Sequence, residues 1–313
     1  MAQDILTVTL NPALDLATAT EKLTAGPKLR CSAPRFDPGG GGLNVSRVIA
    51  ELGGHSKAWT VLGGSLGSMC QDLLRSEDIA FTFMEGPGMT RLSVSVTEEV
   101  SGDQYRFVLP GPEFGAADGE RALESIERAL SGPGLVVVSG SMPPGLPASF
   151  MGRLAGRVSA AGARLILDSS GAPLQAALDE GVFLVKPNLR EAQILAGRDL
   201  PDTEARLVFA GELIDRGAAE VVVISLGGEG ALVVGKDLRL LLRVPPVEVK
   251  SAVGAGDSTV GGLTLGLARG ATLEEAALLG LAAGTAAVST VATALCQRED
   301  VQRLLDQIRV ERL

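Results

Sequence analysis

The segment Val253-Gly254-Ala255-Gly256-Asp257-Ser258 places a carboxylate directly after two glycines, at the start of a run of apolar and small residues that extends to residue 269. We expect this run to form a closely packed helix with Gly254 and Gly256 in its N-terminal turn. Glycine lets the backbone turn with little steric penalty, and the free amides at a helix start point at an anion such as a phosphate. Asp257 would take the proton of a substrate hydroxyl that approaches this phosphate, while the amides stabilise charge on the transferring group. The segment therefore indicates phosphoryl transfer.

A simpler interpretation is that Asp257 only caps the helix, because Asp is a favoured N-terminal residue and Gly-Ala-Gly is an ordinary turn. The six residues alone favour neither interpretation. Other parts of the chain have to decide between them.

The composition indicates a globular protein that acts on a small molecule. The chain has 313 residues, of which 46% are hydrophobic, enough for one large α/β domain or two smaller ones. A net charge of -9 argues against a nucleic-acid surface, although a local basic cluster can still bind phosphate inside a cleft. We therefore expect a small substrate and no nucleic-acid partner.

Cysteine and histidine usage indicates a cytoplasmic protein without a His-rich metal site. The three cysteines are far apart and form no CxxC pair, and His55 is the single histidine. Asp4 interrupts the apolar N-terminal stretch, so we expect no export signal. Residues 277–295 are long and apolar enough to be weighed as a membrane span, but their Ala, Gly, Ser and Thr content favours a helix packed inside a soluble fold. We expect no membrane partner.

Short apolar runs alternate with amphipathic segments along most of the chain, which is typical of a parallel sheet covered by helices. The expected buried strands are residues 5–8, 135–138, 165–167, 183–185 and 221–224. The expected helices are residues 119–130, 147–161, 190–196 and 203–216. We predict a three-layer α/β/α fold with a mostly parallel central sheet.

Polar residues directly follow four of these strands. They are Ser139-Gly140-Ser141, Asp168-Ser169-Ser170, Lys186-Pro187-Asn188 and Ser225-Leu226-Gly227-Gly228. Ligands of open α/β sheets collect beyond the carboxyl ends of the strands. We therefore expect this edge of the sheet to form the site.

Two segments, residues 17–36 and 91–109, break the strand–helix rhythm, and the second alternates like a pair of hairpin strands. An antiparallel flap of such strands would cover the site and exclude water, which a kinase needs in order not to hydrolyse its nucleotide. Lys28, Arg91 and Arg106 fall in or beside the flap, where cations would grip a sugar phosphate. Solvated surface charge is the alternative for each.

The usual nucleotide-binding loops do not fit. Residues 230–236 come close to a P-loop, but Asp237 stands where Ser or Thr binds magnesium, and the residues between the glycines resemble a strand. Thr259 likewise breaks a Rossmann GxGxxG pattern at residue 254.

Three further groups offer ligand contacts, each with a structural alternative. The four glycines at residues 39–42 precede a helix and let a ligand touch the backbone, or they form a plain loop. Asn188 and Glu191 share a helical face near a helix start, where they would position hydrated magnesium or simply cap the helix. Asp15 would accept hydrogen bonds from sugar hydroxyls or serve as a turn residue.

Four motifs occur in an order that resembles the PfkB (ribokinase-like) family of carbohydrate kinases: the glycine run before Asn44, Lys186-Pro187-Asn188 with Glu191, Ser225-Leu226-Gly227, and Gly254-Ala255-Gly256-Asp257. The likeness covers nearly the whole chain and favours catalysis over capping for Asp257. It implies a single ribokinase-like domain over residues 1–313, with a small β-strand lid formed by segments at about 15–36 and 90–110. Thr9-Leu10-Asn11-Pro12-Ala13-Leu14-Asp15 is similar to the phosphosugar-kinase branch of that family.

The resemblance implies a role for each motif. Asp257 would deprotonate the sugar 1-hydroxyl, with the amides of Gly254, Ala255 and Gly256 as the anion hole. Asn188 and Glu191 would organise magnesium-ATP. The nucleotide side would be lined by Lys186, Asn188, Ser225, Gly227 and Gly230. The sugar phosphate would be held by Asp15, Gly40, Gly41, Asn44, Arg91 and Ser141, with Lys28 and Arg106 contributing from the flap.

The implied reaction is ATP-dependent phosphorylation of the 1-hydroxyl of fructose 6-phosphate, giving fructose 1,6-bisphosphate in glycolysis. The alternatives are the 1-phosphofructokinase and tagatose-6-phosphate kinase reactions, and a non-catalytic sugar-phosphate sensor on the same fold. Family members usually pair through their flaps, so a homodimer is expected. They often bind a monovalent cation: its first loop, Ser251 to Val253, is intact, but residues 290–294 lack the Asn, Gly and Arg of the pattern. The sequence therefore leaves potassium activation open.

Overall fold

A computed structural model of the chain describes residues 3–290 and 293–313. The strands are β1 (Ile5–Thr9), β2 (Ala13–Thr20), β3 (Arg35–Gly39), β4 (Lys57–Leu62), β5 (Ala80–Glu85), β6 (Arg91–Glu98), β7 (Gln104–Val108), β8 (Leu135–Ser139), β9 (Arg164–Asp168), β10 (Val182–Val185), β11 (Ala219–Ser225), β12 (Ala231–Gly235), β13 (Leu238–Arg243) and β14 (Arg309–Arg312). The helices are α1 (Gly41–Glu51), α2 (Gly64–Ser76), α3 (Ala116–Ala129), α4 (Ser149–Ala160), α5 (Gly171–Glu180), α6 (Leu189–Ala196), α7 (Thr203–Asp215), α8 (Ala255–Ala268), α9 (Leu273–Val288) and α10 (Arg298–Leu305), with a short 3₁₀ turn η1 (Gly227–Glu229).

The large sheet has ten strands in the order β14-β13-β12-β11-β10-β9-β8-β1-β4-β5. All neighbours from β11 to β5 are parallel, and β12, β13 and β14 add an antiparallel edge. The five strands expected from the sequence all form and lie in the parallel part. The predicted mostly parallel sheet is confirmed.

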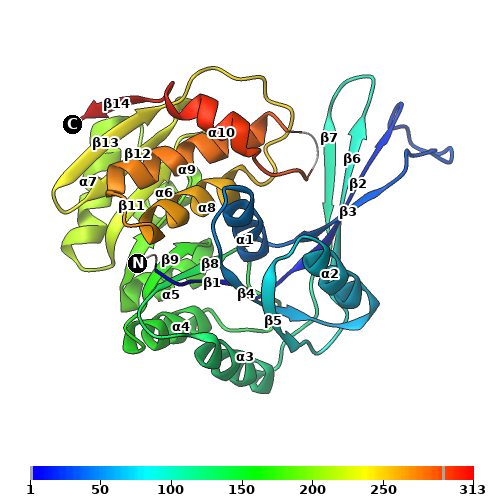
Figure 1. Cartoon of the computed structure of the whole chain (residues 1–313), viewed down its shortest axis with the longest axis horizontal. Helices are drawn as coiled ribbons and strands as arrows, with labels where there is room; N and C mark the ends of the chain where they lie inside the picture. Colours follow the sequence, from blue (N-terminus) through cyan, green and yellow to red (C-terminus); the bar gives the residue numbers. More distant parts are fainter. Residues whose placement is uncertain (1–2, 291–292) are drawn as a thin grey trace.

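Helices cover both faces of this sheet and give the predicted three layers (Figure 1). Helices α1, α8, α9 and α10 pack with one face around one apolar cluster, and helices α3, α4, α5 and α7 pack with the other face around a second cluster. The four expected amphipathic helices correspond to α3, α4, α6 and α7.

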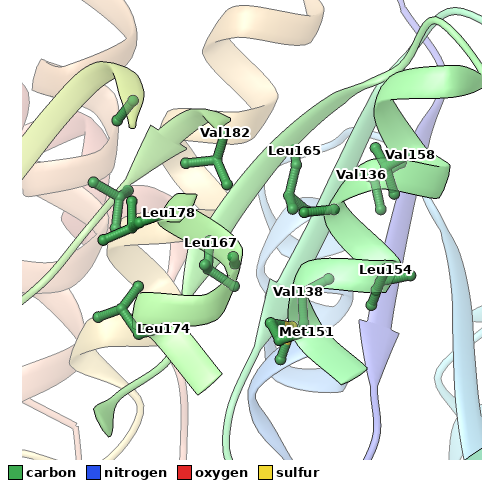
Figure 2. Packing of buried hydrophobic residues seen from close by; sticks show 14 of the residues in the cluster. Val136, Val138, Met151, Leu154, Val158, Leu165, Leu167, Leu174, Leu178 and Val182 are labelled. Atoms are coloured by element: carbon green, nitrogen blue, oxygen red, sulfur yellow. The ribbon is translucent and has the colours of Figure 1, made fainter. Parts of the chain in front are cut away.

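The second face shows why these helices form (Figure 2). Met151, Leu154 and Val158 recur at three- and four-residue spacing along α4, so they share one face of the helix and meet Val136 and Val138 of β8. Each fully buried apolar side chain of this size contributes about 1.5–3 kcal/mol. The packing fixes the strand ends on which the site is built.

Helices α8 and α9 pack against each other more closely than any other helix pair in the described chain, because glycines line their contact. A Cβ at Gly262 would lie 2.7 Å from the carbonyl oxygen of Leu279, so a larger residue does not fit there. The helix expected within residues 277–295 is shorter than predicted, since α9 ends at Val288. No helix of the described chain is long and apolar enough to cross a membrane.

The small sheet, in the order β3-β2-β6-β7, projects from the large one (Figure 1). The hairpin expected at residues 91–109 is confirmed as the antiparallel pair β6 and β7. The expectation of an antiparallel flap is wrong for the central pair, because β2 and β6 are parallel. Both strands enter the small sheet from the large one, so they run in the same direction.

Candidate active site

Asp257 is the third residue of α8, and side chains from two other elements hold its carboxylate. Asn44 Nδ2 of α1 donates to Oδ2 over 2.8 Å, and Ser139 Oγ at the end of β8 donates to Oδ1 over 3.2 Å. Gly254, with φ 75°, occupies the N-cap position without a side-chain cap. The carboxylate therefore faces across the sheet edge, which contradicts the interpretation of Asp257 as a simple cap.

The surroundings of Asp257 make it a stronger base than an ordinary aspartate. Burial raises its pKa to about 6; hydrogen bonds from Asn44 and Ser139 oppose this shift, and the charges of Asp168 and Lys186 act in opposite directions. A carboxylate with this pKa is ionised at neutral pH and still accepts a proton readily. The position suits a general base.

A buried ion pair lies beside this carboxylate. Lys186 Nζ is 3.2 Å from Asp168 Oδ1, and the two side chains are only 6% and 17% exposed. The pair borders the α8 N-terminus, because a Cβ at Gly256 would lie 3.7 Å from Lys186 Nζ. Sequence reasoning assigned no role to Asp168 or to Ser139, although both stand at the polar strand ends that marked the site.

The glycine run brings α1 against the end of β8. A Cβ at Gly41 would lie 2.2 Å from Ser139 Oγ, so only glycine fits at this approach. The helix begins at Gly41 rather than after the fourth glycine, which corrects the expected boundary. Asn44 reaches Asp257 because of this close approach.

A cavity of about 490 Å³ lies on the other side of the α8 N-terminus, a size typical of small-ligand sites. It is lined by all five residues expected on the nucleotide side, Lys186, Asn188, Ser225, Gly227 and Gly230. Sequence reasoning missed its apolar wall, formed by Val244, Pro245, Pro246, Val247, Val249, Leu281 and Val288. Such a wall suits a flat apolar ring system.

Asn188 and Glu191 form a capping box at the start of α6. Asn188 Oδ1 accepts from the Glu191 amide, and Glu191 Oε2 accepts from the Asn188 amide, both over 2.9 Å. Capping, the structural alternative, is therefore present. Among the described residues it uses one carboxylate oxygen of Glu191, Oε2, and leaves Oε1 available to a hydrated cation.

Three of the residues expected to hold the sugar phosphate, Asp15, Arg91 and Arg106, lie close together in the small sheet. Asp15 of β2 lies opposite Ser93 of β6, and burial raises its pKa to about 6 while the charges of Arg91 and Arg106 lower it. Arg91 donates to the carbonyl oxygens of Asn11 and Leu109.

Lys28 lies apart from this group, in the exposed connection between β2 and β3. Among the described residues, no hydrogen bond or ion pair joins its side chain to the other expected site residues. The structure of a single chain therefore brings Arg91, Arg106 and Asp15 together but leaves Lys28 outside.

The two loops expected to bind a monovalent cation differ in how far they can be described. Ser251 is buried, and its Oγ donates to Gln104 Oε1 and accepts from the Val253 amide, both over 3.2 Å. The expected second loop, residues 290–294, includes residues 291 and 292, which lie outside the described residues.

A nucleotide-sized cavity and a cationic sheet junction thus meet at one partly buried aspartate on a glycine-rich helix start, an arrangement that defines a ribokinase-like kinase. The chain belongs to the pfkB family of carbohydrate kinases, which it matches over residues 8–300. The resemblance inferred from the motifs is confirmed.

Named relatives extend over almost the full chain. The ATP-dependent 6-phosphofructokinase isozyme 2 of Mycobacterium tuberculosis is 43% identical over 302 residues, covering 96% of this chain and 89% of the relative. The isozyme 2 of Escherichia coli is 42% identical, covering 96% and 97%. The 1-phosphofructokinase of Bacillus subtilis is 34% identical, covering 99% and 100%.

Solved structures agree with the fold. Phosphofructokinase-2 of Escherichia coli in complex with fructose-6-phosphate matches with a TM-score of 0.92 at 40% identity, covering 97% of this chain and 99% of that one. The same enzyme in complex with potassium gives a TM-score of 0.93 at 41% identity, with the same coverage. Its tetrameric inhibited form gives 0.92 at 41% identity and covers 97% and 99%.

Proposed function

We propose that this protein transfers the γ-phosphoryl group of ATP to the 1-hydroxyl of fructose 6-phosphate, forming fructose 1,6-bisphosphate. The observation that supports this proposal is the partly buried Asp257, a carboxylate with a raised pKa that lies between the cavity and the junction of the two sheets. Two relatives at 42–43% identity are named for this activity, and a solved relative binds fructose-6-phosphate.

In the proposed reaction, the Asp257 carboxylate accepts the proton of the 1-hydroxyl as its oxygen attacks the γ-phosphorus. A new P–O bond forms, the bond from the γ-phosphorus to the β–γ bridging oxygen breaks, and ADP leaves with that electron pair. The amides of Gly254, Ala255 and Gly256 at the α8 N-terminus stabilise the charge on the transferring group. Lys186 supplies a buried cation beside them.

Magnesium is expected to arrive with the nucleotide and to neutralise phosphate charge. Its fit rests on the free Oε1 of Glu191, because Mg²⁺ prefers oxygen ligands and usually keeps several waters. Asn188, which lines the cavity, and Glu191, which is not among its lining residues, would hold such an ion through water. We assign no potassium requirement, since residues 290–294 lack the Asn, Gly and Arg of the pattern.

The small sheet is proposed as a lid and as the surface of a homodimer. Tyr105 and Phe107 of β7 are 41% and 53% exposed, and strand alternation places them on the same face of the sheet. Arg106 points to the opposite face, toward Asp15. A sheet that is polar toward the site and apolar on its other side suits pairing of two copies. Three free cysteines suit the reducing cytoplasm, where we place the protein.

The test is release of ADP from magnesium-ATP with fructose 6-phosphate, tagatose 6-phosphate or fructose 1-phosphate as acceptor. We expect the highest kcat/KM for fructose 6-phosphate. A preference for fructose 1-phosphate would contradict the proposed substrate but not the proposed mechanism. It would agree with the name of the Bacillus subtilis relative, 1-phosphofructokinase. Silence with all three would favour a sensor.

A further inference from the structure

We infer that Asn11 is a positioning residue for the sugar phosphate, because it fixes both Ser141 and Arg91, two of the donors expected to hold that phosphate. This inference rests on the proposed function. Asn11 lies between β1 and β2, where the chain leaves the large sheet for the small one. It therefore contacts elements on both sides of the junction.

The side chain of Asn11 sets the direction of the Ser141 hydroxyl. Asn11 Nδ2 lies 3.2 Å from Ser141 Oγ and 3.3 Å from the carbonyl oxygen of Met142. A carbonyl oxygen can only accept, so the amide nitrogen, and not the amide oxygen, has to face this pair. Ser141 Oγ consequently accepts a hydrogen bond from Asn11 Nδ2. Its own proton stays free to donate to an anion.

The other end of the amide explains why this orientation is kept. Asn11 Oδ1 is buried and has no hydrogen-bond partner among the described residues. It packs against Gly111, where a Cβ would lie 2.2 Å from it. Turning the amide over would bring Oδ1 against the Met142 carbonyl and leave the nitrogen unpaired instead. A buried oxygen without a partner is unfavourable, so the residue is better explained by its donor side than by stability.

The main chain of Asn11 holds Arg91. Its carbonyl oxygen accepts from Arg91 Nε over 3.3 Å and from Nη2 over 3.1 Å, and Arg91 Nη1 donates to Leu109 O over 3.4 Å. A guanidinium has five N–H groups, and these bonds use three of them. One N–H remains on each terminal nitrogen, the pair that binds two oxygens of one phosphate.

A double-mutant cycle tests whether Asn11 acts through Ser141. The variants are Asn11→Ala, Ser141→Ala and the double variant, compared by kcat and by KM for the phosphosugar and for ATP. Each single change should raise the phosphosugar KM about tenfold, the size of one hydrogen bond to a charged group. The phosphosugar KM of the double variant should be no higher than the larger of the two single-variant KM values. The kcat, the ATP KM and the melting temperature should change little in all three variants.

Gln307→Ala is the matched control, because Gln307 also donates its amide to a backbone carbonyl, that of Arg303, at the end of α10. It should leave both KM values unchanged. Additive effects of about a hundredfold, or an unchanged phosphosugar KM in Asn11→Ala, would overturn the inference. Equal changes in kcat, both KM values and melting temperature would show a purely structural role. The cycle uses whichever phosphosugar the wild type prefers, so a wrong substrate assignment is recognised separately.

Discussion

At the scale of single residues, the proposed site depends on a partly buried carboxylate that remains ionised at neutral pH. Asp257 is held there by two neutral donors, Asn44 and Ser139, rather than by a direct ion pair. An ion pair would lower the pKa and weaken the base. Neutral donors orient the carboxylate and leave burial free to raise its pKa to about 6.

Replacing this base should separate binding from turnover. Asp257→Asn keeps the shape of the side chain but cannot accept the proton, so kcat should fall at least about a hundredfold, as expected for loss of a general base. The dissociation constant for magnesium-ATP, measured by calorimetry, should change less than about threefold. Turnover close to that of the wild type would show that another group is the base.

The same substitution should stabilise the protein, and more so at high pH. The pKa of Asp257 rises from 3.8 to about 6 on folding, so the native state binds more protons than the unfolded state between these values. Stability is therefore lost as pH rises through this window, by roughly 3 kcal/mol in all. The asparagine side chain of the variant does not titrate, so the variant does not lose this stability as pH rises.

Thermal unfolding of Asp257→Asn and wild type at pH 8 and pH 4.5 checks this sign. The variant should melt several degrees higher at pH 8, with a smaller difference at pH 4.5. A variant that melts lower than wild type at pH 8 would contradict the raised pKa.

At the scale of elements, the same capping motif occurs at two helix starts with different surroundings. Helices α6 and α9 both begin with a capping box, Asn188 with Glu191 and Thr272 with Glu275. The first follows β10 and borders the nucleotide cavity, whereas the second follows the C-terminus of α8, away from the lining of that cavity. Local sequence alone does not distinguish the two glutamates.

These two boxes provide a matched pair for the proposed magnesium role. Glu191→Gln retains an oxygen that can accept from the Asn188 amide but removes the charge, so the magnesium concentration for half-maximal rate should rise about tenfold. Glu275→Gln should leave it unchanged. Rates are measured at fixed ATP over a magnesium titration, with melting temperatures as the control for capping. Equal magnesium curves for both variants would exclude Glu191 from the metal site.

At the scale of the whole molecule, the small sheet connects the two substrate sides. Asp37 of β3 accepts hydrogen bonds from Arg47 of α1 and from Thr293 in the loop after α9. Gln104 of β7 accepts from Ser251 in the loop before α8. The small sheet is therefore hydrogen-bonded to α1, to the loop before α8 and to the loop after α9.

The apolar side of this sheet should also set the oligomeric state. Phe107→Asp places a charge on the proposed dimer surface, and desolvating that charge is unfavourable, so the variant should be monomeric at concentrations where the wild type is a dimer. Val208→Asp is the control, because Val208 is an exposed apolar residue of α7, outside the small sheet. Sedimentation velocity measures both. A dimeric Phe107→Asp variant, or a monomeric wild type, would contradict the proposed surface.

Much of the fold could be predicted because it depends on local patterns. The buried parallel strands are continuous apolar runs, and the polar residues after them have to meet at one edge of the sheet. The strands β4, β5, β13 and β14 and the helices α2, α5 and α10 were not predicted. The strands β5 and β14 are exposed edge strands and α5 and α10 are short helices, so their patterns are weaker. The motifs also selected Asp257 and five residues that the structure brings together around one cavity.

Contacts between distant parts of the chain decided the rest. Asn44 and Asp257 are 213 positions apart, and no local pattern says that one holds the other. No local pattern indicates the parallel pairing of β2 with β6, the ion pair of Asp168 with Lys186, or the hydrogen bond from Asn11 to Ser141. Local sequence specifies elements and turns because their interactions are short-range. Burial, and with it the raised pKa of the Asp257 carboxylate, arises only when those elements pack together.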